Sequence, residues 1–398
     1  MNNIKNLTIV FSLGLMAALG SVSLAGEGAG DPRVRVIWPP EEAGPAANFY
    51  FSGDASVVVA QSFPGIEIQI HVDRGDGWVL KRRLFEISNI GIWPFGLSLD
   101  GGVIGITNFM STDLEIGQGT MTLPRIWEMA SGQYALIGQV YGASVSGDGQ
   151  SVAATGRFDG RVEALFWSES DGLVNLNRER DEPDTGFVPR AMSYDGQVIA
   201  GRGERFEPIN DTQYAYVNHA WVYFDGTMMD IPELDFDFEV SNEVVGVSGD
   251  GLAVIGLAHG HVTGQGFIGD YSWIWTLEDG TVEIADPTRF ESVSVIDINY
   301  DASIVLGSAS FIGGELAGQF LWYPEAGFIL LDELFERKGI SIDAQYPTFR
   351  EISEDGTKLM GTGSMDNRSV GLIVTLPEQG DVLSDAQRDG YIRSKLGR

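Results

Sequence analysis

The stretch SVSGDGQSVAATG, residues 144–156, predicts a tight β-hairpin. Asp148 and Gly149 form a dipeptide that readily adopts the positive φ angles of a two-residue turn, and apolar residues stand on both sides of it. Similar stretches recur along the chain as AMSYDGQVIAG, GVSGDGLAVIG and EISEDGTKLMG. The recurrence indicates that this hairpin is a unit of architecture rather than an isolated feature.

Seven copies of the hairpin align on the aspartate of the turn, and their period of about 50 residues is typical of a solenoid or a propeller. A Ser or Asn stands two residues before the aspartate, where both side chains can bond backbone groups of the turn. Gly follows the aspartate in five copies, whereas Ala55 and Ala302 replace it in two, which would allow those turns to differ in type. The aligned aspartates are Asp54, Asp100, Asp148, Asp195, Asp250, Asp301 and Asp355.

A second hairpin follows in most copies. In EALFWSESDG and YSWIWTLEDG, for example, a Trp stands five residues before a Gly, and another apolar strand comes next. We expect these Trp side chains to pack in the core of the sheets. A small residue six places after the aspartate is expected to let a neighbouring sheet approach closely. Each repeat therefore holds four strands, which favours a propeller over the alternative, a linear β-solenoid.

The two ends of the chain complete this arrangement. The last repeat has a third strand in GLIVTLP but only a weak fourth strand near Val382. We expect residues 34–38 to lie beside residues 372–376 and close the ring, which would cover two sheet edges that otherwise invite aggregation. The expected fold is all-β: a seven-bladed β-propeller with four antiparallel strands per blade, closed by an N-terminal strand.

The N-terminus predicts export. Lys5 precedes an apolar run that is too short to span a membrane comfortably, and Ser23 and Ala25 suit the small positions before a signal-peptidase cut. We therefore expect a signal peptide over residues 1–25, cleaved near Ala25. The propeller would follow over 26–383 and a polar tail over 384–398. The protein would be periplasmic or secreted, with no membrane span in the mature chain.

Charge and composition exclude several classes of function. The formal net charge of −31 makes nucleic acid and anionic lipid poor partners. The chain has no Cys, which excludes disulfides, thiolate metal sites and cysteine nucleophiles. We expect a monomer, with an extracellular glycan, peptide or protein as its partner.

The repeat resembles that of the HAF-type extracellular repeat proteins of bacteria. The resemblance rests on GASVSGDGQSVAATG, followed by EALFWSESDGLVNL, and covers nearly all of the mature chain. It implies an exported, propeller-like protein and supplies no catalytic residues. The last repeat departs from the pattern because Val374 stands where others have Trp, and Val72 does so in the first.

No catalytic motif stands out. The chain lacks a G-x-S-x-G nucleophile elbow, a phosphate-binding G-x-x-x-x-G-K-[ST] loop and an H-E-x-x-H zinc motif. His259 and His261 in AHGHVTGQG could hold a metal with a third ligand, although an exposed loop is the alternative. No cofactor is predicted, and a divalent cation is possible.

Topology indicates which face of the ring carries binding. The two hairpin turns of each repeat share one face, so the loops of variable length share the other. Exposed aromatic and Arg side chains beside a channel mouth are typical of sugar or peptide binding. The leading hypothesis is a non-catalytic binding module; a polysaccharide hydrolase or lyase and a structural surface protein are alternatives. The candidate ligand-binding residues are Arg157, Arg161, Arg202, Arg205, Tyr214, Tyr216, His219 and Tyr271.

Overall fold

The structure is a computed structural model. It describes residues 31, 33–39, 47–62, 67–73, 78–85, 91–111, 120–128, 134–136, 140–158, 161–177, 186–210, 213–234, 239–262 and 266–382. The signal peptide expected over 1–25 and the tail expected over 384–398 lie outside these residues. Within the described part, no helix is long and apolar enough to cross a membrane.

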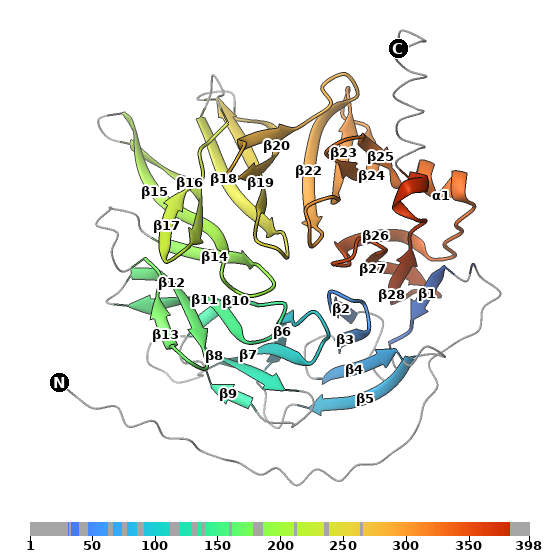
Figure 1. The fold of residues 1–398 in the computed structure, drawn as a ribbon, viewed down its shortest axis with the longest axis horizontal. Helices are drawn as coiled ribbons and strands as arrows, with labels where there is room; N and C mark the ends of the chain where they lie inside the picture. Colours follow the sequence, from blue (N-terminus) through green and yellow to red (C-terminus); the bar gives the residue numbers. More distant parts are fainter. Residues whose placement is uncertain are drawn as a thin grey trace.

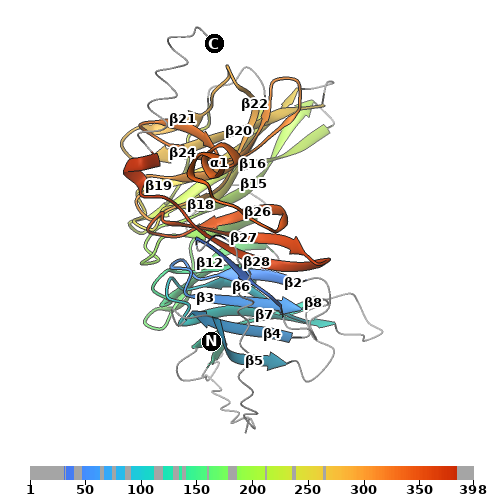
Figure 2. The same ribbon diagram turned by 90° about the vertical axis from the view of Figure 1, so that its right-hand side faces the viewer.

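Antiparallel sheets stand around a common centre, so the fold is an all-β propeller (Figure 1). Seen from the side, the strands run across the ring from one face to the other (Figure 2). The first strand of each group of four lies nearest the centre and is called the inner strand; these are β2, β6, β10, β14, β18, β22 and β26.

The strands are bounded as follows. Five sheets have four strands each: β2 (Ala47–Phe51), β3 (Val57–Ser62), β4 (Glu67–Asp73) and β5 (Trp78–Phe85); β6 (Gly91–Leu97), β7 (Val103–Ser111), β8 (Thr120–Glu128) and β9 (Tyr134–Leu136); β18 (Glu239–Val247), β19 (Ala253–Val262), β20 (Gly266–Thr276) and β21 (Gly280–Ile284); β22 (Phe290–Ile298), β23 (Val305–Phe311), β24 (Leu316–Tyr323) and β25 (Gly327–Leu330); and β26 (Gln345–Ile352), β27 (Lys358–Met365) and β28 (Arg368–Thr375) with β1 (Val34–Ile37). The eight-stranded sheet holds β10 (Val140–Val145), β11 (Ser151–Phe158), β12 (Arg161–Ser168), β13 (Gly172–Asn175), β14 (Gly186–Met192), β15 (Ile199–Asn210), β16 (Gln213–Phe224) and β17 (Thr227–Asp230). The helix α1 (Leu331–Lys338) follows β25.

The expected pairing of the two chain ends is confirmed. Strand β1 lies antiparallel to β28, with Val34 opposite Val374 and Val36 opposite Leu372. The last sheet therefore takes its fourth strand from the N-terminal side of the first repeat, which joins the two ends of the repeat array.

The number of separate sheets differs from the expected seven, because the described residues form six. Within the eight-stranded sheet, two groups of four strands are joined by a single parallel bridge between Val162 of β12 and Gly186 of β14. Glycine permits this approach: a Cβ atom on Gly186 would lie only 3.1 Å from Cβ of Val162.

Each Asp turn is held by the same three side-chain hydrogen bonds. In the fifth turn, Ser248 Oγ donates to Asp250 Oδ1 (2.7 Å) and accepts from the N–H of Ala253 (3.0 Å). Asp250 Oδ1 also accepts from the N–H of Leu252 (3.0 Å). The other six turns repeat these bonds, with Asn299 in place of Ser in the sixth. The structural role expected for the Ser and Asp columns is confirmed.

The seven turns also bond to one another through their backbones. Each turn donates one N–H to a carbonyl of the next turn, over distances of 2.7 to 3.0 Å, and the seventh donates from Glu354 to Gly53 of the first. The turns therefore form a closed ring of hydrogen bonds. We call the face that carries it the turn face and the opposite face the loop face. The bonds are Asp54 N–H to Leu99 O, Leu99 to Gly147, Asp148 to Tyr194, Tyr194 to Gly249, Asp250 to Tyr300, Tyr300 to Glu354, and Glu354 to Gly53.

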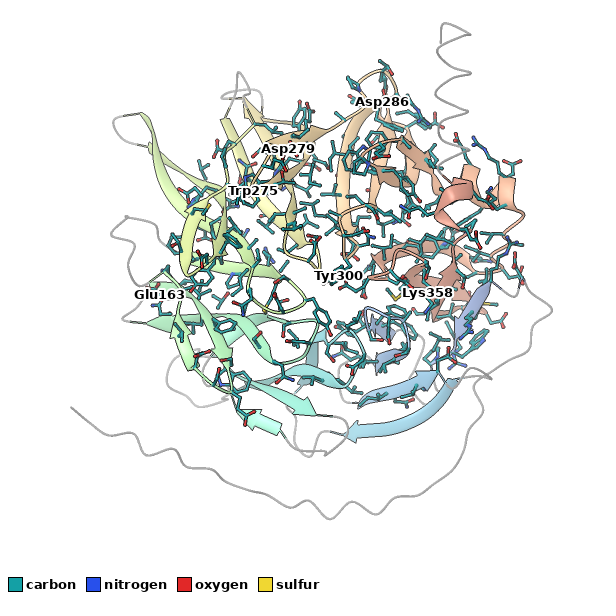
Figure 3. The ribbon with its side chains drawn as sticks, in the orientation of Figure 1. Glu163, Trp275, Asp279, Asp286, Tyr300 and Lys358 are labelled. Carbon is teal, nitrogen blue, oxygen red and sulfur yellow. The ribbon has the colours of Figure 1, made fainter. Side chains whose placement is uncertain are left out.

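Large and small residues share the middle of this ring. The residue before each aspartate is Gly in three turns and large in the other four. The rings of Tyr194 and Tyr300 meet edge to face with centroids 6.1 Å apart, and Figure 3 places Tyr300 at the centre of the molecule. A Cβ on Gly249 would lie 2.6 Å from Glu354 Oε2, so the glycines provide the space that the large side chains occupy.

The residue after the aspartate is left-handed in all seven turns. The residue after the aspartate has a φ of 57° at Ala55 and 56° at Ala302, against 73° at Gly251 and similar values at the other glycines. The two alanine turns thus do not differ in type. Alanine is accommodated at position 302 because it packs in a cluster that contains the small Ala253 of the preceding repeat. A Cβ on Gly251 would instead lie 2.7 Å from Cγ2 of Val198.

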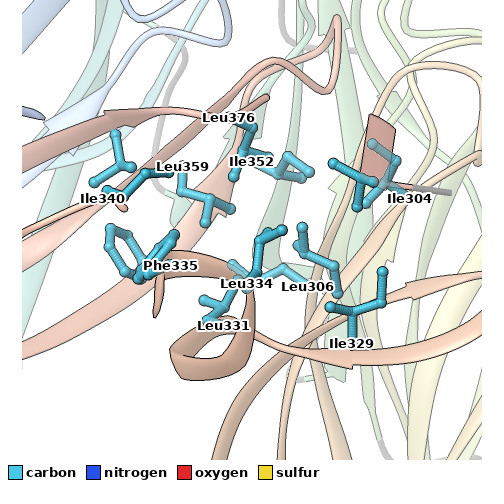
Figure 4. Close-up of a cluster of buried hydrophobic side chains, with 14 of the residues drawn as sticks. Ile304, Leu306, Ile329, Leu331, Leu334, Phe335, Ile340, Ile352, Leu359 and Leu376 are labelled. Carbon is cyan, nitrogen blue, oxygen red and sulfur yellow. The ribbon is translucent and has the colours of Figure 1, made fainter. Parts of the chain in front are cut away.

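The small residue six places after the aspartate makes its close contact within its own sheet, not with a neighbouring sheet as expected. Gly201 faces Trp221 across β15 and β16, and a Cβ at Gly201 would lie 2.6 Å from that indole ring. In the predicted Trp column, Trp275 is buried, and Trp167 and Trp322 are partly buried against apolar clusters, which confirms the core role expected for them. Trp221 and Trp273, which the sequence did not single out, are fully buried. Apolar clusters fill the spaces between sheets; the largest includes Leu331, Leu334 and Phe335 of α1 (Figure 4).

The contact between Gly251 and Val198 gives a prediction about stability. Gly251→Ala should lower the free energy of unfolding by about 2 kcal/mol, because a left-handed alanine is strained and its Cβ meets Val198. Val198→Ala should remove the close contact with the new Cβ. The double variant should therefore lose less stability than the sum of the two single losses. A double-mutant cycle from chemical denaturation measures the coupling. Strictly additive losses would contradict the proposed contact.

Candidate functional site

A pocket of about 480 Å³ lies where the first repeat meets the last, between β2 and β26–β28. Strands β2 and β26 both start at the loop face, and the pocket follows them inward toward the turns. We call it the seam pocket. Its lining residues are Asn48, Phe49, Tyr50, Phe51, Gln345, Tyr346, Arg350, Glu351, Gly361, Thr362, Gly363, Ser364 and Ser369.

Small residues of β27 provide the space for the pocket. Gly361 stands in the same repeat column as Gly201, but Leu372 of β28 faces it instead of a Trp. A Cβ on Gly361 would first meet the backbone of β26, at the carbonyl oxygen of Thr348, and the leucine opposite is smaller than a tryptophan. The last sheet is therefore less filled on this side than the sheet that contains Trp221.

One wall of the pocket is polar and comes from the first repeat. The hydroxyl of Tyr50 donates to Gln61 Oε1 over 3.3 Å, and Asn48 Nδ2 lies 3.5 Å from the same oxygen. Burial raises the pKa of the Tyr50 hydroxyl above its ordinary value, and the nearby Arg350 opposes this effect. Tyr50 thus stays neutral well above physiological pH and can both donate and accept hydrogen bonds.

Two acidic residues of neighbouring inner strands meet beside the pocket. Desolvation, followed by the charge of Asp297, raises the pKa of Glu351 to about 8, while a backbone hydrogen bond from Phe51 and the charge of Arg350 act against this rise. Desolvation also raises the pKa of Asp297 to about 7, although Asp297 Oδ2 accepts a 2.8 Å bond from the N–H of Ile352. Both residues are half-buried, and Glu351 lines the pocket.

A third acid lies in the middle of the turn ring. Burial, followed by the charge of Asp250, raises the pKa of Glu354 to about 7. Glu354 Oε2 has no hydrogen-bond partner among the described residues. It belongs to the turn face, whereas Glu351 faces the seam pocket.

Tyr346 and Arg350 form the outer part of the pocket. The Tyr346 side chain is 85% exposed, and its φ of 53° is unusual for a bulky residue. Arg350 is exposed, and among the described residues its guanidinium has no hydrogen-bond or ion-pair partner. A β-bulge between Phe349 and Glu351 turns the strand locally, so that adjacent residues 350 and 351 both line the pocket.

The residues predicted from sequence lie on three other strand pairs, and none of them lines the seam pocket. Arg157 and Arg161 flank the hairpin between β11 and β12 at the loop face. Arg205, Tyr214 and Tyr216 lie in β15 and β16. The side chains of these five residues, and of His261, are outside the described part of the structure.

Three of the predicted ligand-binding residues have described side chains. Arg202 forms ion pairs with Glu243 (2.6 Å) and Glu204 (3.6 Å). His219 is buried, with Nε2 3.6 Å from Asp230 Oδ1. Tyr271 packs against an apolar cluster that contains Trp273. These partners are structural contacts within a strand or between strands, and the ligand-binding assignments stay predictions.

The proposed metal pair is only partly described. His259 Nδ1 lies 2.6 Å from Asp270 Oδ1, its cross-strand neighbour, while the side chain of His261 falls outside the described residues. No group of three His, Asp or Glu side chains suited to a metal occurs in the part that the structure describes.

One sequence signal could have indicated the seam pocket. Four residues before the turn aspartate, five repeats carry Tyr50, Gly96, Ser144, Ala191 and Gly246, whereas the last two carry Asp297 and Glu351. Burial of a carboxylate on an inner strand near the axis costs stability. An acid in a column of otherwise uncharged residues therefore indicates that its surroundings differ from those of the other repeats.

No protein-family model and no curated protein matches the sequence. Solved propellers are similar in fold. The β-propeller domain of the Trilobed protease from Pyrococcus furiosus, which has an open velcro topology, is 12% identical, with a TM-score of 0.52 over 82% of this chain and 95% of that one. Oligogalacturonate lyase from Vibrio parahaemolyticus is 11% identical, with a TM-score of 0.51 over 90% of this chain and 98% of that one. At this identity the likeness shows the fold alone.

Glu351 gives a prediction about pH and stability. Its pKa is about 8 in the folded protein against an ordinary value of 4.5, so the folded state binds a proton that the unfolded state releases between these values. This stabilising contribution is complete below pH 4.5 and is lost as the pH rises through 8. Glu351→Gln cannot ionise, so its melting temperature should exceed that of the wild type by a few degrees at pH 9, with little difference at pH 5.

Thermal unfolding followed by circular dichroism at both pH values measures this effect. Glu336→Gln, at an exposed position of α1, is the matched control and should show no such change with pH. Equal differences from the wild type at pH 5 and pH 9 for Glu351→Gln would contradict the linkage.

Proposed function

We propose that the protein is an exported, non-catalytic propeller of seven blades that binds an extracellular saccharide in the seam pocket. The seam pocket carries this proposal because polar side chains line it, it lies at the loop face, and the exposed Tyr346 belongs to its wall. Its volume of about 480 Å³ is within the range of small-molecule sites.

The lining suits a ligand rich in hydroxyl groups. Asn48, Gln345 and Ser364 offer both donors and acceptors, which a sugar needs at each hydroxyl. The ring of Tyr346 offers an apolar face to the C–H groups of a pyranose while its hydroxyl stays in water. A purely apolar ligand would leave the polar groups of this pocket without partners, which costs binding free energy.

Other parts of the proposal are supported by the repeat and by the N-terminal sequence. Seven repeats, and seven hydrogen bonds that link their turns in a closed ring, support seven blades, two of which share the eight-stranded sheet. The apolar segment before Ala25 supports export to the periplasm or beyond, and the repeat motifs support membership of the HAF-type proteins.

A second candidate function is cleavage of a polysaccharide. It is favoured by Glu351, because burial raises the pKa of this pocket carboxyl to about 8 and keeps it protonated at neutral pH, as a general acid requires. The bond from Phe51 also gives this acid a structural role between strands, which is why binding without turnover is preferred.

A glycan array probed with the mature protein tests the binding proposal. Ser364→Trp should fill the pocket and reduce retention at least tenfold, whereas Ser310→Trp should bind like the wild type. Ser310 is the matched control because it holds the same repeat position on β23, away from the pocket. Equal binding by both variants, or retention of no glycan by the wild type, would overturn the proposal.

Product analysis of the retained glycans tests the second candidate. If the protein is an enzyme, wild type should release shorter saccharides, and Glu351→Gln should abolish release while it keeps affinity. Unchanged glycans after prolonged incubation with wild type would exclude turnover of those glycans.

A further inference from the structure

We propose that the seam pocket takes an acidic saccharide, a uronic acid unit whose carboxylate pairs with the Arg350 guanidinium and accepts a hydrogen bond from the carboxyl of Glu351. This inference rests on the proposed function and names its ligand class. It follows from the charges that the pocket contains, from the bulge that brings them together, and from their protonation.

The charge inside the pocket differs from that of the rest of the protein. The chain carries 56 acidic and 25 basic residues, yet Arg350 and Glu351 are the two acidic or basic side chains among the lining residues. Burial raises the pKa of Glu351 to about 8, so at neutral pH this carboxyl is largely protonated and the lining carries a net positive charge. A carboxylate therefore meets a cation and a neutral donor, without a repelling anion on the lining.

The bulge in β26 makes the pair possible. In a regular strand, adjacent side chains point to opposite faces, so residues 350 and 351 could not both face one ligand. The register shift between Phe349 and Glu351 removes this restriction. A guanidinium can bond both oxygens of a carboxylate, and a protonated carboxyl donates one short, strong hydrogen bond to such an oxygen.

Arg350 is available for such a ligand. It is exposed and, among the described residues, has no hydrogen-bond or ion-pair partner, in contrast to Arg202 with its two glutamates. Arg190 stands in the same repeat column on β14, beside the same type of bulge, but its neighbours are Pro189 and Ala191 and it does not line the pocket. It therefore serves as a matched control.

The groups that face Glu351 determine how binding should depend on pH. They are Asp297 on β22, Arg350 on β26 and Tyr50 on β2. Asp297, with a pKa of about 7, ionises first as the pH rises, and Glu351 follows at about 8. Above that pH the donor is lost and a negative charge faces the ligand, so the affinity for a carboxylate should fall.

The experiment measures binding of uronate tetrasaccharides by titration calorimetry. The probes are tetragalacturonate, tetramannuronate and tetraglucuronate, each compared with its neutral methyl ester. At pH 6 we expect at least one acid to bind ten or more times more tightly than its ester. Arg350→Ala should remove that advantage and Arg190→Ala should retain it. From pH 6 to pH 9.5 the affinity of the wild type for that acid should fall at least tenfold, whereas in Glu351→Gln the fall should be much smaller.

The outcomes separate this inference from the proposed function. Equal binding of acid and ester, both lost in Ser364→Trp, would overturn the acidic ligand and keep saccharide binding in the pocket. Equal effects of the two Arg substitutions, or a wild-type affinity that does not change with pH, would also overturn the pairing. Failure of all six probes to bind would overturn the inference, and the glycan array then decides on the proposed function separately.

Discussion

The closed ring of backbone hydrogen bonds between the turns is the constraint on which the rest of the structure depends. Each turn accepts a bond at the carbonyl of the residue before its aspartate and donates from that residue or from the aspartate, so every turn must hold these groups within bonding distance of both neighbours. This requirement explains why Ser or Asn acts with Asp to stabilise the interior of every turn, and why the residue after the aspartate is left-handed even where it is alanine. It also limits the side chains that can share the axis, where glycines alternate with Leu99, Tyr194 and Tyr300.

At the opposite face, the described residues form no such ring of bonds between repeats, and it is there that the repeats can differ. The seam between the first and last repeats is the most distinct position, because its last sheet is completed by a strand from the other end of the chain. Leu372 stands opposite Gly361 there, whereas the larger Trp221 stands opposite Gly201 in another sheet, so a smaller side chain lies beside the pocket. A pocket at the seam is thus a consequence of local packing in one repeat rather than of the repeat pattern itself.

The sequence was a good guide to what is local and repeated. The Ser, Asp and Gly columns predicted the turns, and the missing fourth strand predicted the pairing of β1 with β28, because both follow from short-range hydrogen bonding and strand counting. The bridge between Val162 and Gly186 was not predictable, since it depends on how closely two neighbouring groups approach. The small column was assigned to contact with a neighbouring sheet, yet Trp221 covers Gly201 within one sheet.

The position of the candidate site also depends on packing between repeats, which the sequence pattern does not give. Topology predicts binding at the loop face, but the candidate Arg and aromatic residues lie on β11–β20, whereas the pocket lies between β2 and β28. Asp297 and Glu351 are not required by the fold, because five other repeats place uncharged residues, among them Ala191 and Gly246, in this column. Burying an ionisable group costs stability, and its raised pKa records that cost. The repeat does not require an ionisable residue at this position, and its burial lowers stability. Its presence is therefore better explained by what it faces, and Glu351 faces the seam pocket.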